Sequence, residues 1–422
     1  MKFLILYLLM TVHEATSYTE ETKCSVQNDN IDCSHLDLTT IPRHLPVNAT
    51  SLNLIWNSIK IVKSFSFKSL RYITYLDLGR NVIELIEINA FHGLHRLRTL
   101  HLHDNVINVF PDGMFERLNG LQVLSIDGNK LKYFQDDKIT KVSKIVSLTT
   151  LSFDVYPDFK FPRQWGTLSK LTDLRIFAMS AKVKFNKAMF VHVNMMQTTA
   201  LSINVVPFIS EDFFEHFPKL ESITLSIGSD LPNNPIDQVF KSFGIFRGKN
   251  ISNLEIRSGR FDNWFILNYK RMRYLWSICL KRLTLNNLYI KDIPIYAMQV
   301  FCIKSTCLEY LEFSDNIMFD RGAAVVAVMN NLKNLKVLKI TRNWRNSRRK
   351  RSQPSKLYNF VLPKTLEELY IEHNMDGDMA DVEVVNGFNL RVLSLKDNEM
   401  WSCIGTFTGI INVEYTSISW NF

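Results

Sequence analysis

Histidine and aspartate side chains recur at a fixed interval in the N-terminal part of the chain. The spacing from Asp77 to His101 equals that from His101 to Ser125, and His103 precedes Asp127 by the same interval. If one interval is one structural repeat, stacking places His101 beside Asp77 and Ser125, and His103 beside Asp127. Neighbouring carboxylates favour the charged imidazole, so such a patch would bind an anionic ligand more strongly after acidification.

Two flanking residues, Arg98 and Asp104, complete this predicted ligand-binding set. The alternative interpretation is a polar face whose two histidines are only solvated, and both interpretations stay open at this point. The residue types also suit a metal ion, but nothing in the sequence fixes a coordination geometry. We therefore predict no metal site and no other cofactor.

A basic segment is the second group whose residue types suggest chemistry. Six cations lie close together in a stretch that contains no acid: Arg342, Arg345, Arg348, Arg349, Lys350 and Arg351. The formal net charge of the chain is +9, and without these six residues it would be +3, so the basicity is local. The segment is consistent with a solvated charge run, with a protease site at Arg351, or with a contact to an anion or nucleic acid.

The N-terminus predicts secretion. Met1 and Lys2 precede an apolar run over residues 3–12, and the small residues Ala15 and Ser17 follow, which predicts a signal peptide over residues 1–17. No later stretch has the roughly 18 apolar residues of a transmembrane helix. Secretion would make the sequons at Asn48 and Asn250 usable for glycosylation and would place the chain on the extracellular side of the secretory pathway.

Six cysteines are too few for a disulfide-dense scaffold, but secretion permits pairing. Cys24 and Cys33 precede the first repeat, where a short disulfide loop would pin a cap over the end of the core. Cys279 and Cys307 occupy equivalent positions in adjacent repeats, so strand stacking would bring their Cα atoms about 5 Å apart. Cys302 is either a buried thiol or a competitor in that pair, and Cys403 has no nearby candidate.

The leucines explain these intervals. The pattern LxxLxLxxNxL recurs fourteen times, with its fourth residue at Leu52, Leu76, Leu100, Leu124, Leu151, Leu174, Leu201, Ile223, Leu254, Leu283, Leu311, Leu338, Leu369 and Leu393. One copy cannot bury its own apolar side, so successive copies stack their strands into a parallel sheet. The sequence therefore predicts an α/β leucine-rich repeat solenoid, a horseshoe with a continuous concave parallel β-sheet and an irregular or short-helical convex side.

Two further rows keep the repeat period. Phe67, Phe91 and Phe115 each recur at one fixed offset before the fourth-position leucine, which predicts a buried convex row rather than a ligand pocket. Asparagine at the ninth position suits the turn out of the strand, where its side chain can bond neighbouring backbone groups. It is present at Asn57, Asn81, Asn105 and Asn129, is lost over six repeats, and returns at Asn316, Asn343, Asn374 and Asn398.

The interrupted asparagine row suggests the division of the chain. We predict an N-terminal cap over residues 18–48, regular repeats over 49–147, irregular central repeats over 148–307 and C-terminal repeats over 308–422. The last repeat lacks a cap, so we expect a fragment or a truncated form of a longer protein whose missing part would hold the cap and a membrane span.

Three stretches together resemble the ectodomain of Toll-like receptors. They are the cap and first repeat DCSHLDLTTIPRHLPVNATSLNLIWNSI, the two repeats DNVINVFPDGMFERLNGLQVLSIDGNKL, and LEYLEFSDNIMFDRGA from Leu308 to Ala323. Many extracellular leucine-rich repeat proteins share the first two motifs, whereas the third looks like the junction between the central and C-terminal subdomains of this family.

The resemblance implies an innate immune recognition ectodomain that binds a microbial or an endogenous ligand and forms receptor homodimers or heterodimers, at the cell surface or in endosomes. The alternative is a secreted leucine-rich repeat binding, adhesion or decoy protein without signalling. Nucleic acid is a weakly supported partner, and a membrane would be reached only through a missing C-terminal span. The chain has no phosphate-binding Gly-rich loop, no HExxH motif and no GxSxG motif, so we predict no enzymatic activity.

The protease interpretation of the basic segment can be tested directly. The basic segment contains the spacing Arg-x-Lys/Arg-Arg, in residues 348–351. This spacing resembles the recognition site of secretory convertases and predicts cleavage between Arg351 and Ser352. Chain secreted from convertase-competent cells should give two fragments on a denaturing gel, and Arg351→Ala should give one band. A single full-length band for both proteins would contradict the processing hypothesis.

Overall fold

The computed structural model describes residues 17–18, 24–131, 140–191, 193, 195, 197–228, 235–258, 265–317, 329–343, 357–374, 381–397 and 410–417. The chain divides into two compact units. The N-terminal unit contains residues 1–177 and 190–197, and the C-terminal unit contains residues 178–189 and 198–422. Apart from Ser17, the predicted signal peptide lies outside the described residues.

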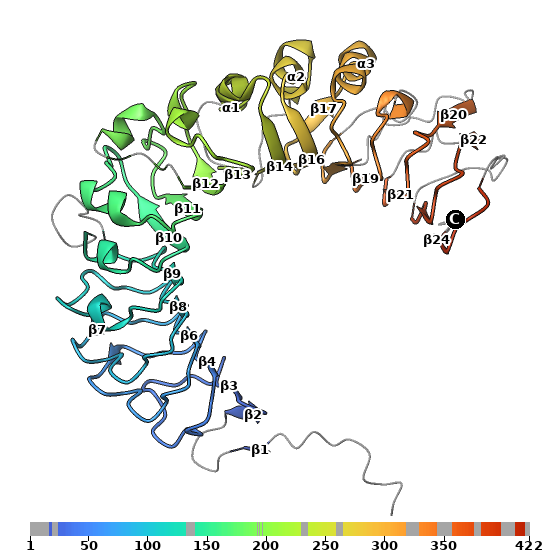
Figure 1. Ribbon diagram of the computed structural model, residues 1–422. Coiled ribbons are helices and arrows are strands. Elements are labelled where there is room, and N and C mark those ends of the chain that lie inside the picture. The colour runs from blue at the N-terminus through green and yellow to red at the C-terminus, as the bar shows by residue number, and fades with distance from the viewer. Residues whose placement is uncertain are drawn as a thin grey trace, which may run out of the picture. The chain divides into compact units, whose positions relative to one another are not determined.

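The N-terminal unit is built on a ladder of short strands (Figure 1). Strand β2 pairs antiparallel with β1 and β3, and the ladder then continues in parallel through β4, β6, β8, β9 and β10. The strands and 3₁₀ helices are β1 (Ser17–Tyr18), β2 (Ser25–Gln27), β3 (Asn30–Asp32), β4 (Ser51–Asn53), β5 (Ile61–Val62), β6 (Tyr75–Asp77), β7 (Leu85–Ile86), β8 (Thr99–His101), η1 (Phe115–Arg117), β9 (Val123–Ser125), η2 (Thr140–Lys144), β10 (Thr150–Val155), η3 (Arg163–Thr167) and β11 (Asp173–Ala178).

The C-terminal unit repeats this design with longer strands and adds helices. Its parallel ladder runs through β12, β13, β14, β16, β18, β19, β21, β23 and β24. The elements are η4 (Lys187–Phe190), β12 (Ala200–Val206), η5 (Phe213–His216), β13 (Ser222–Ile227), α1 (Ile236–Ser242), η6 (Phe243–Phe246), β14 (Asn250–Ser258), β15 (Phe265–Ile266), α2 (Tyr269–Trp276), β16 (Cys279–Asn286), β17 (Ile290–Asp292), α3 (Ile295–Lys304), β18 (Tyr310–Ser314), η7 (Met329–Asn331), β19 (Val337–Thr341), β20 (Leu357–Val361), β21 (Glu368–Glu372), β22 (Asp381–Val385), β23 (Val392–Ser394) and β24 (Tyr415–Ser417).

The predicted leucine rows form the core of both units. Leu76, Leu100 and Leu124 pair along the ladder of the N-terminal unit and are fully buried. Phe67 and Phe91 of the predicted phenylalanine row are also buried, and their rings stack 6.0 Å apart. Side chains alternate across a strand, so the residues between the leucines point to the opposite face. The leucine-rich repeat solenoid is confirmed, and the phenylalanine row is core.

Asparagine side chains close the turns of the N-terminal unit as predicted. In Asn105, Oδ1 accepts the N–H of Ile83 at 2.9 Å, and Nδ2 donates to the carbonyls of Leu78 and Leu102 at 3.0 and 3.1 Å. Asn81 and Asn129 make the equivalent contacts one repeat away on either side. Each buried amide therefore joins its own repeat to the preceding one.

The asparagine row of the C-terminal unit has a different acceptor bond. Asn343 Oδ1 accepts the backbone N–H of Asn316, and Asn374 Oδ1 accepts that of Asn343, at 3.2 and 3.1 Å. Their Nδ2 atoms donate to the carbonyls of Phe313 and Ile340 at 2.8 Å. Asn398, the last member of the predicted row, lies outside the described residues.

Strands are longer where asparagine is missing. The four strands β4, β6, β8 and β9 have three residues each, whereas β12, β14 and β16 have seven, nine and eight. Without an asparagine to satisfy the turn, the backbone groups that follow the leucines are instead satisfied by continued pairing between strands. The ladder continues through these repeats, with a register shift between Ile203 and Val206 in the pairing of β12 with β13.

Both predicted disulfides are present. Cys24 and Cys33 are bonded with a Cα–Cα distance of 4.4 Å, and Cys279 and Cys307 with a distance of 5.2 Å. Cys302 is a free, buried thiol on α3, and burial raises its pKa to about 12. Cys403 lies outside the described residues. Within the described ranges, no helix has both the length and the apolar composition that crossing a bilayer requires.

The asparagine contacts predict a large stability effect. Asn105→Ala would leave the N–H of Ile83 and two carbonyls unpaired in a buried turn, so the free energy of unfolding should fall by about 2–4 kcal/mol. Asn108→Ala, an exposed site on the same turn, is the matched control and should change stability little. Urea unfolding followed by circular dichroism measures both, and equal effects would contradict the role of the asparagine row.

Candidate ligand-binding surface

The strand register brings the predicted histidine and aspartate residues together in the N-terminal unit. Asp77 pairs with His101 between β6 and β8, and His101 pairs with Ser125 between β8 and β9. Ser125 pairs in turn with Ser152 of β10. His101 therefore has the neighbours that the repeat interval predicts. We call Asp77, His101, His103, Asp104, Ser125, Asp127, Ser152 and Asp154 the polar strand face.

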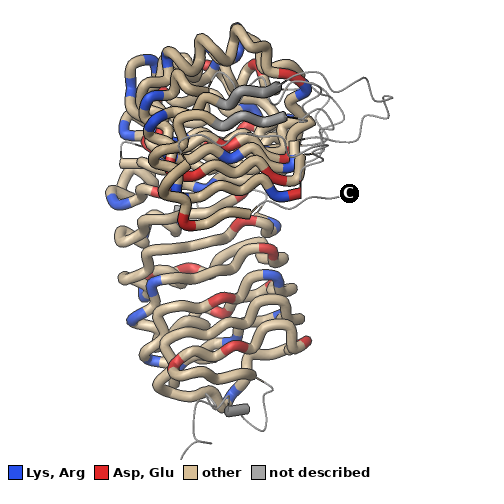
Figure 2. Tube along the Cα trace, turned by 90° about the vertical axis from the view of Figure 1, so that its right-hand side faces the viewer, with Lys and Arg blue, Asp and Glu red and all other residues tan. Residues whose placement is uncertain are grey.

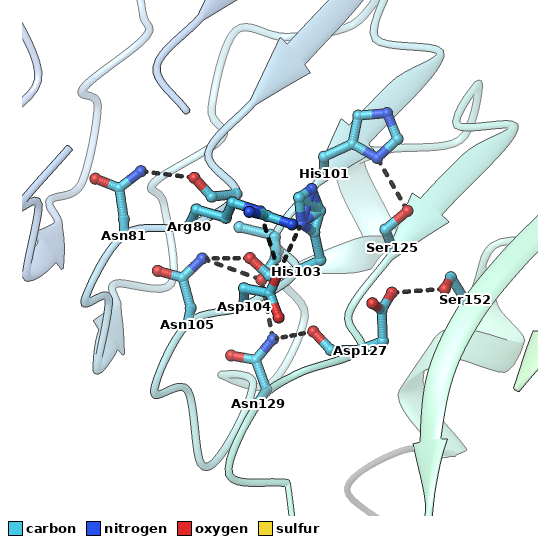
Figure 3. Close-up of polar contacts among 12 residues, drawn as sticks. Arg80, Asn81, His101, His103, Asp104, Asn105, Ser125, Asp127, Asn129 and Ser152 are labelled. Atoms are coloured by element: carbon cyan, nitrogen blue, oxygen red, sulfur yellow. Dashed lines mark hydrogen bonds and ion pairs between the residues drawn. The ribbon is translucent and has the colours of Figure 1, made fainter. Parts of the chain in front are cut away.

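Hydroxyl groups and backbone N–H groups hold these side chains (Figure 3). Nδ1 of His101 lies 2.9 Å from Oγ of Ser125, and the Ser152 hydroxyl donates to Oδ1 of Asp127 at 2.5 Å. Asp77 accepts the Tyr75 hydroxyl at 3.1 Å and the N–H of Gly79 at 2.8 Å. The carboxylates are thus fixed by neutral donors, which leaves their negative charge uncompensated locally.

His103 lies against a glycine of the preceding repeat. A Cβ atom at Gly79 would approach Cε1 of His103 to 2.5 Å, so only glycine permits this packing. Nδ1 of His103 is 3.8 Å from Oδ2 of Asp104, which is also 3.3 Å from Nε of Arg80 (Figure 3). The sequence predicted Asp127 as the carboxylate beside His103. The backbone agrees with this prediction, because the N–H groups of Leu102 and Asp104 donate to the carbonyls of Ser125 and Asp127 and so set His103 opposite Asp127. The carboxylate within ion-pair distance of the His103 ring is that of Asp104, while the Asp127 carboxylate accepts the hydroxyl of Ser152.

Arg98 does not join this group. Its Nη1 donates to the carbonyl of Gly120 at 2.8 Å, in the turn that precedes β9. Arg98 itself precedes β8, so it lies at the edge of the ladder where strands begin, whereas His103 and Asp104 follow the end of β8. The predicted set of six residues therefore separates into a connected group of five and one arginine at the other edge.

Asp154 is a member of the polar strand face that sequence analysis missed. It is only 2% exposed, and its Oδ2 accepts the N–H of Asn129 at 3.2 Å. Burial, partly offset by hydrogen bonds from the N–H groups of Gly128 and Asn129, raises its pKa to about 6, and repulsion from Asp127 and Asp104 adds to the rise. Within the described residues Oδ1 has no hydrogen-bond partner. Asp127 and Asp154 each stand three residues after the fourth-position leucine of their repeats, Leu124 and Leu151, so the repeat pattern held the signal that places Asp154 on this face.

The expected direction of the pKa shift of His101 is wrong. We predicted that Asp77 and Asp127 would favour its charged form, but burial is the largest influence and lowers the pKa of His101 below its usual value. Repulsion from His103 and Arg175 acts in the same direction as burial. The carboxylates oppose this change without reversing it. His101 is therefore neutral near neutral pH and does not attract an anion there.

The remaining predicted positions are not members of this face. Asn48 and Asn250 are exposed, and each is at an edge of its unit's ladder where a strand begins. Of the basic segment, Arg342 is described, and it forms two hydrogen bonds to Asp315 at 2.7 and 2.8 Å. Arg351 and the other four cations lie outside the described residues. The described residues contain no group of three histidines, cysteines or acids suited to a metal ion.

Comparisons with known proteins add to this geometry. The family model for the leucine-rich repeat matches residues 47–107 and 95–149. Human Toll-like receptor 3 is 43% identical over 58 residues, and Toll-like receptor 3 of Boselaphus tragocamelus is 44% identical over 57 residues. The chain is a leucine-rich repeat protein similar to Toll-like receptors. The similarity covers 14% of this chain and 6% of the length of these receptors.

Two further comparisons, one with a curated protein and one with a solved structure, cover different shares of the chain. The mouse leucine-rich repeat-containing protein 4B is 37% identical over 62 residues, which is 15% of this chain and 9% of that protein. A crystal structure of a TLR13–ssRNA13 complex aligns with 90% of this chain and 68% of its own, with 16% identity and a TM-score of 0.48. The repeat model and the stretch shared with Toll-like receptor 3 show leucine-rich repeats similar to those of Toll-like receptors in part of the chain.

The pKa of Asp154 predicts a pH dependence of stability. A folded-state pKa raised to about 6 stabilises the fold below the ordinary aspartate pKa, and this stability is lost as the pH rises through 6. His101 acts in the opposite sense, because its lowered pKa makes acid destabilising. Through Asp154, the free energy of unfolding of the wild type should rise by roughly 2–3 kcal/mol as the pH falls from about 7 to about 4, and the Asp154→Asn variant should lack this rise.

The measurement is urea unfolding across this pH range, with hydrogen exchange of peptides from β9 and β10 as the local readout. Asp112→Asn is the matched control, since its side chain is 90% exposed. If Asp154→Asn and Asp112→Asn follow the same pH profile as the wild type, Asp154 does not titrate in the folded state as described.

Proposed function

We propose that this chain is the ligand-binding ectodomain of an innate immune recognition receptor, which binds a microbial or an endogenous ligand and dimerises for signalling. The observation that carries the proposal is the polar strand face, a set of fixed side chains contributed by consecutive repeats of a chain that is similar to Toll-like receptors. Because successive repeats contribute neighbouring side chains, the face suits an extended macromolecule better than a small metabolite.

The fixed geometry of the face supports binding. His101 to Ser125 and Asp127 to Ser152 are hydrogen bonds between neighbouring repeats, so the side chains are ordered before any partner arrives. A surface that is ordered in advance loses less conformational entropy on association. The stiffness of the ladder beneath it therefore contributes to affinity.

The compartment in this proposal is the extracellular space or the lumen of endosomes. The two disulfides are consistent with an oxidising compartment, and the sequons at Asn48 and Asn250 are exposed. The similarity to Toll-like receptor 3 favours the same orientation. Glycans at these sequons would occupy the edges where strands begin and would leave the opposite edges open to partners.

A second candidate function is a secreted leucine-rich repeat binding, adhesion or decoy protein without signalling. The stretch shared with the leucine-rich repeat-containing protein 4B favours it, since that stretch is about as long as the one shared with Toll-like receptor 3. Both candidates require ligand binding. They differ in whether bound ligand brings two chains together.

The test uses the full chain fused to the membrane span and cytoplasmic domain of human Toll-like receptor 3 in reporter cells. Cells are exposed separately to double-stranded RNA, single-stranded RNA, a bacterial lipopeptide and conditioned medium from stressed cells. The proposal expects at least one of them to activate the reporter and to double the mass of the soluble chain in light scattering. Binding without either response would favour the decoy, and absence of binding to every sample would contradict both candidates.

A further inference from the structure

The polar strand face is acidic although the chain as a whole is basic. The strands β6 and β8–β11, with the short turns that follow β6, β8 and β9 (residues 78–80, 102–104 and 126–128), carry five aspartates and two arginines, a formal charge of −3 when histidines are neutral. The formal charge of the whole chain is +9. Figure 2, which draws Asp and Glu in red, shows acidic positions on the rungs of the N-terminal repeats. The face therefore has a charge opposite to that of the protein around it.

The two arginines are already paired. Arg80 lies 3.3 Å from Asp104, and Arg175 lies 2.8 Å from Asp173 of its own strand. Arg80 also stacks over the ring of Trp56 at 4.6 Å, which directs it along the edge of the ladder. Neither arginine is within ion-pair distance of the three aspartates nearest the middle of the face.

Those three carboxylates are Asp77, Asp127 and Asp154. Among the described residues, none of them has a lysine or arginine nitrogen within 4.0 Å. Asp77 and Asp127 are held by hydroxyl and backbone donors, so each keeps lone pairs for a further donor. Oδ1 of Asp154 is buried and has no hydrogen-bond partner among the described residues, so a carboxylate with an unsatisfied acceptor adjoins Asp127.

We infer that the polar strand face binds a lysine- and arginine-rich segment of a partner protein at neutral pH and releases it in an acidified compartment. This inference rests on the proposed function and gives the chemical class of its ligand. Ammonium and guanidinium groups can donate charge-assisted hydrogen bonds to the remaining lone pairs of Asp77 and Asp127, and their positive charge also offsets that of the buried Asp154. Opposite charges across the contact also speed association and fix its orientation.

Other partners fit this face less well. A nucleic acid would bring its phosphates against uncompensated carboxylates, and like charges brought together cost affinity. A metal ion needs several ligands converging on one point, and no such group of three is found in the described part of the chain. An extended cationic segment requires neither, because its side chains can meet carboxylates on successive rungs, which are about 4.8 Å apart.

Release in acid follows from two groups on the face. Asp154 faces Asp127 and Asp104 from the preceding repeats and Tyr156 from its own repeat, and with its pKa of about 6 it loses its charge as the pH falls. His101 faces Tyr75 and Asp77 from β6, His103 from its own repeat, Ser125 from β9 and Asp127 from the turn after it, and Arg175 from β11. Its protonation at lower pH adds a positive charge. Both changes weaken the attraction for a cation.

The first experiment measures binding of a fluorescein-labelled Lys-Gly repeat peptide to the full chain by fluorescence anisotropy at low ionic strength. Asp77→Asn and Asp127→Asn are nearly isosteric and retain an oxygen acceptor, so each should weaken binding about five- to tenfold at neutral pH. Glu116→Gln, an exposed residue of η1, is the control and should bind as the wild type does. Circular dichroism establishes that each variant is folded.

The second experiment repeats the titration at about pH 5, where wild-type affinity should be about tenfold lower. A change of this size corresponds to a bound peptide that lowers the pKa of one group on the face by about one unit. Asp154→Asn should reduce this pH dependence to about threefold or less. Tighter binding at acid pH, or binding that both aspartate substitutions leave unchanged in folded protein, would overturn the inference. The same holds if the peptide does not bind the wild type at neutral pH.

The two proposals fail separately. A chain that activates the receptor reporter with one of the microbial or cellular samples, but ignores the cationic peptide, retains the proposed function and loses this inference. A chain that binds the peptide through Asp77 and Asp127, but never dimerises or activates the reporter, retains the inference as a property of a secreted binding protein.

Discussion

The asparagine side chain in the turn after each strand is the interaction on which the regular repeats depend. A turn buried between repeats must satisfy its backbone N–H and C=O groups without water. The amide of Asn105 does so because it offers two donors and an acceptor on one planar group, and it bonds two repeats at once. Burial of the leucines drives the stacking of repeats, and the asparagine amide provides the hydrogen bonds that the buried backbone of the turn would otherwise lack.

The candidate surface lies where this arrangement ends. Asn129 is the last asparagine of the first row, and the next repeat has Tyr156 at the equivalent position. The N–H of Asn129 is accepted by a carboxylate, that of Asp154, instead of by another backbone or amide oxygen. The end of the row therefore places a buried acid directly beside Asp127. The charge of the face and the interruption of the repeat have one structural origin.

Much of the fold could be predicted from the spacing of residues, because a constant repeat length places equivalent residues of successive repeats side by side in the stacked strands. The constant interval was enough to place His101 between Asp77 and Ser125, and the equivalent positions of Cys279 and Cys307 identified a disulfide. The properties of single groups did not follow. His101 titrates according to how deeply it is packed, which periodicity does not encode, and Arg98 turns to the carbonyl of Gly120 because a long side chain at the edge of a strand has several directions open to it.

Asp154 shows a second reason why sequence analysis stopped short. The repeat pattern places it at the position that Asp127 occupies in the preceding repeat, but the pattern does not show that Asp154 is buried. Its importance comes from an unsatisfied oxygen and from two neighbouring acids that belong to different repeats. A pattern of residue types can suggest a charged surface, but the balance between burial and hydrogen bonding depends on atomic contacts.

The two asparagine rows differ in how closely they fix the length of the chain between one strand and the next. In the N-terminal unit the acceptor oxygen bonds an N–H beyond the preceding asparagine, as Asn105 does with Ile83, so the chain after each turn is held to one path. In the C-terminal unit the bond ends at the preceding asparagine itself, as between Asn343 and Asn316. The C-terminal repeats can therefore lengthen independently, and their fourth-position leucines are indeed spaced more widely and less evenly from Leu311 to Leu369 than those of the first four repeats. New surface can thus be acquired there without rebuilding the ladder.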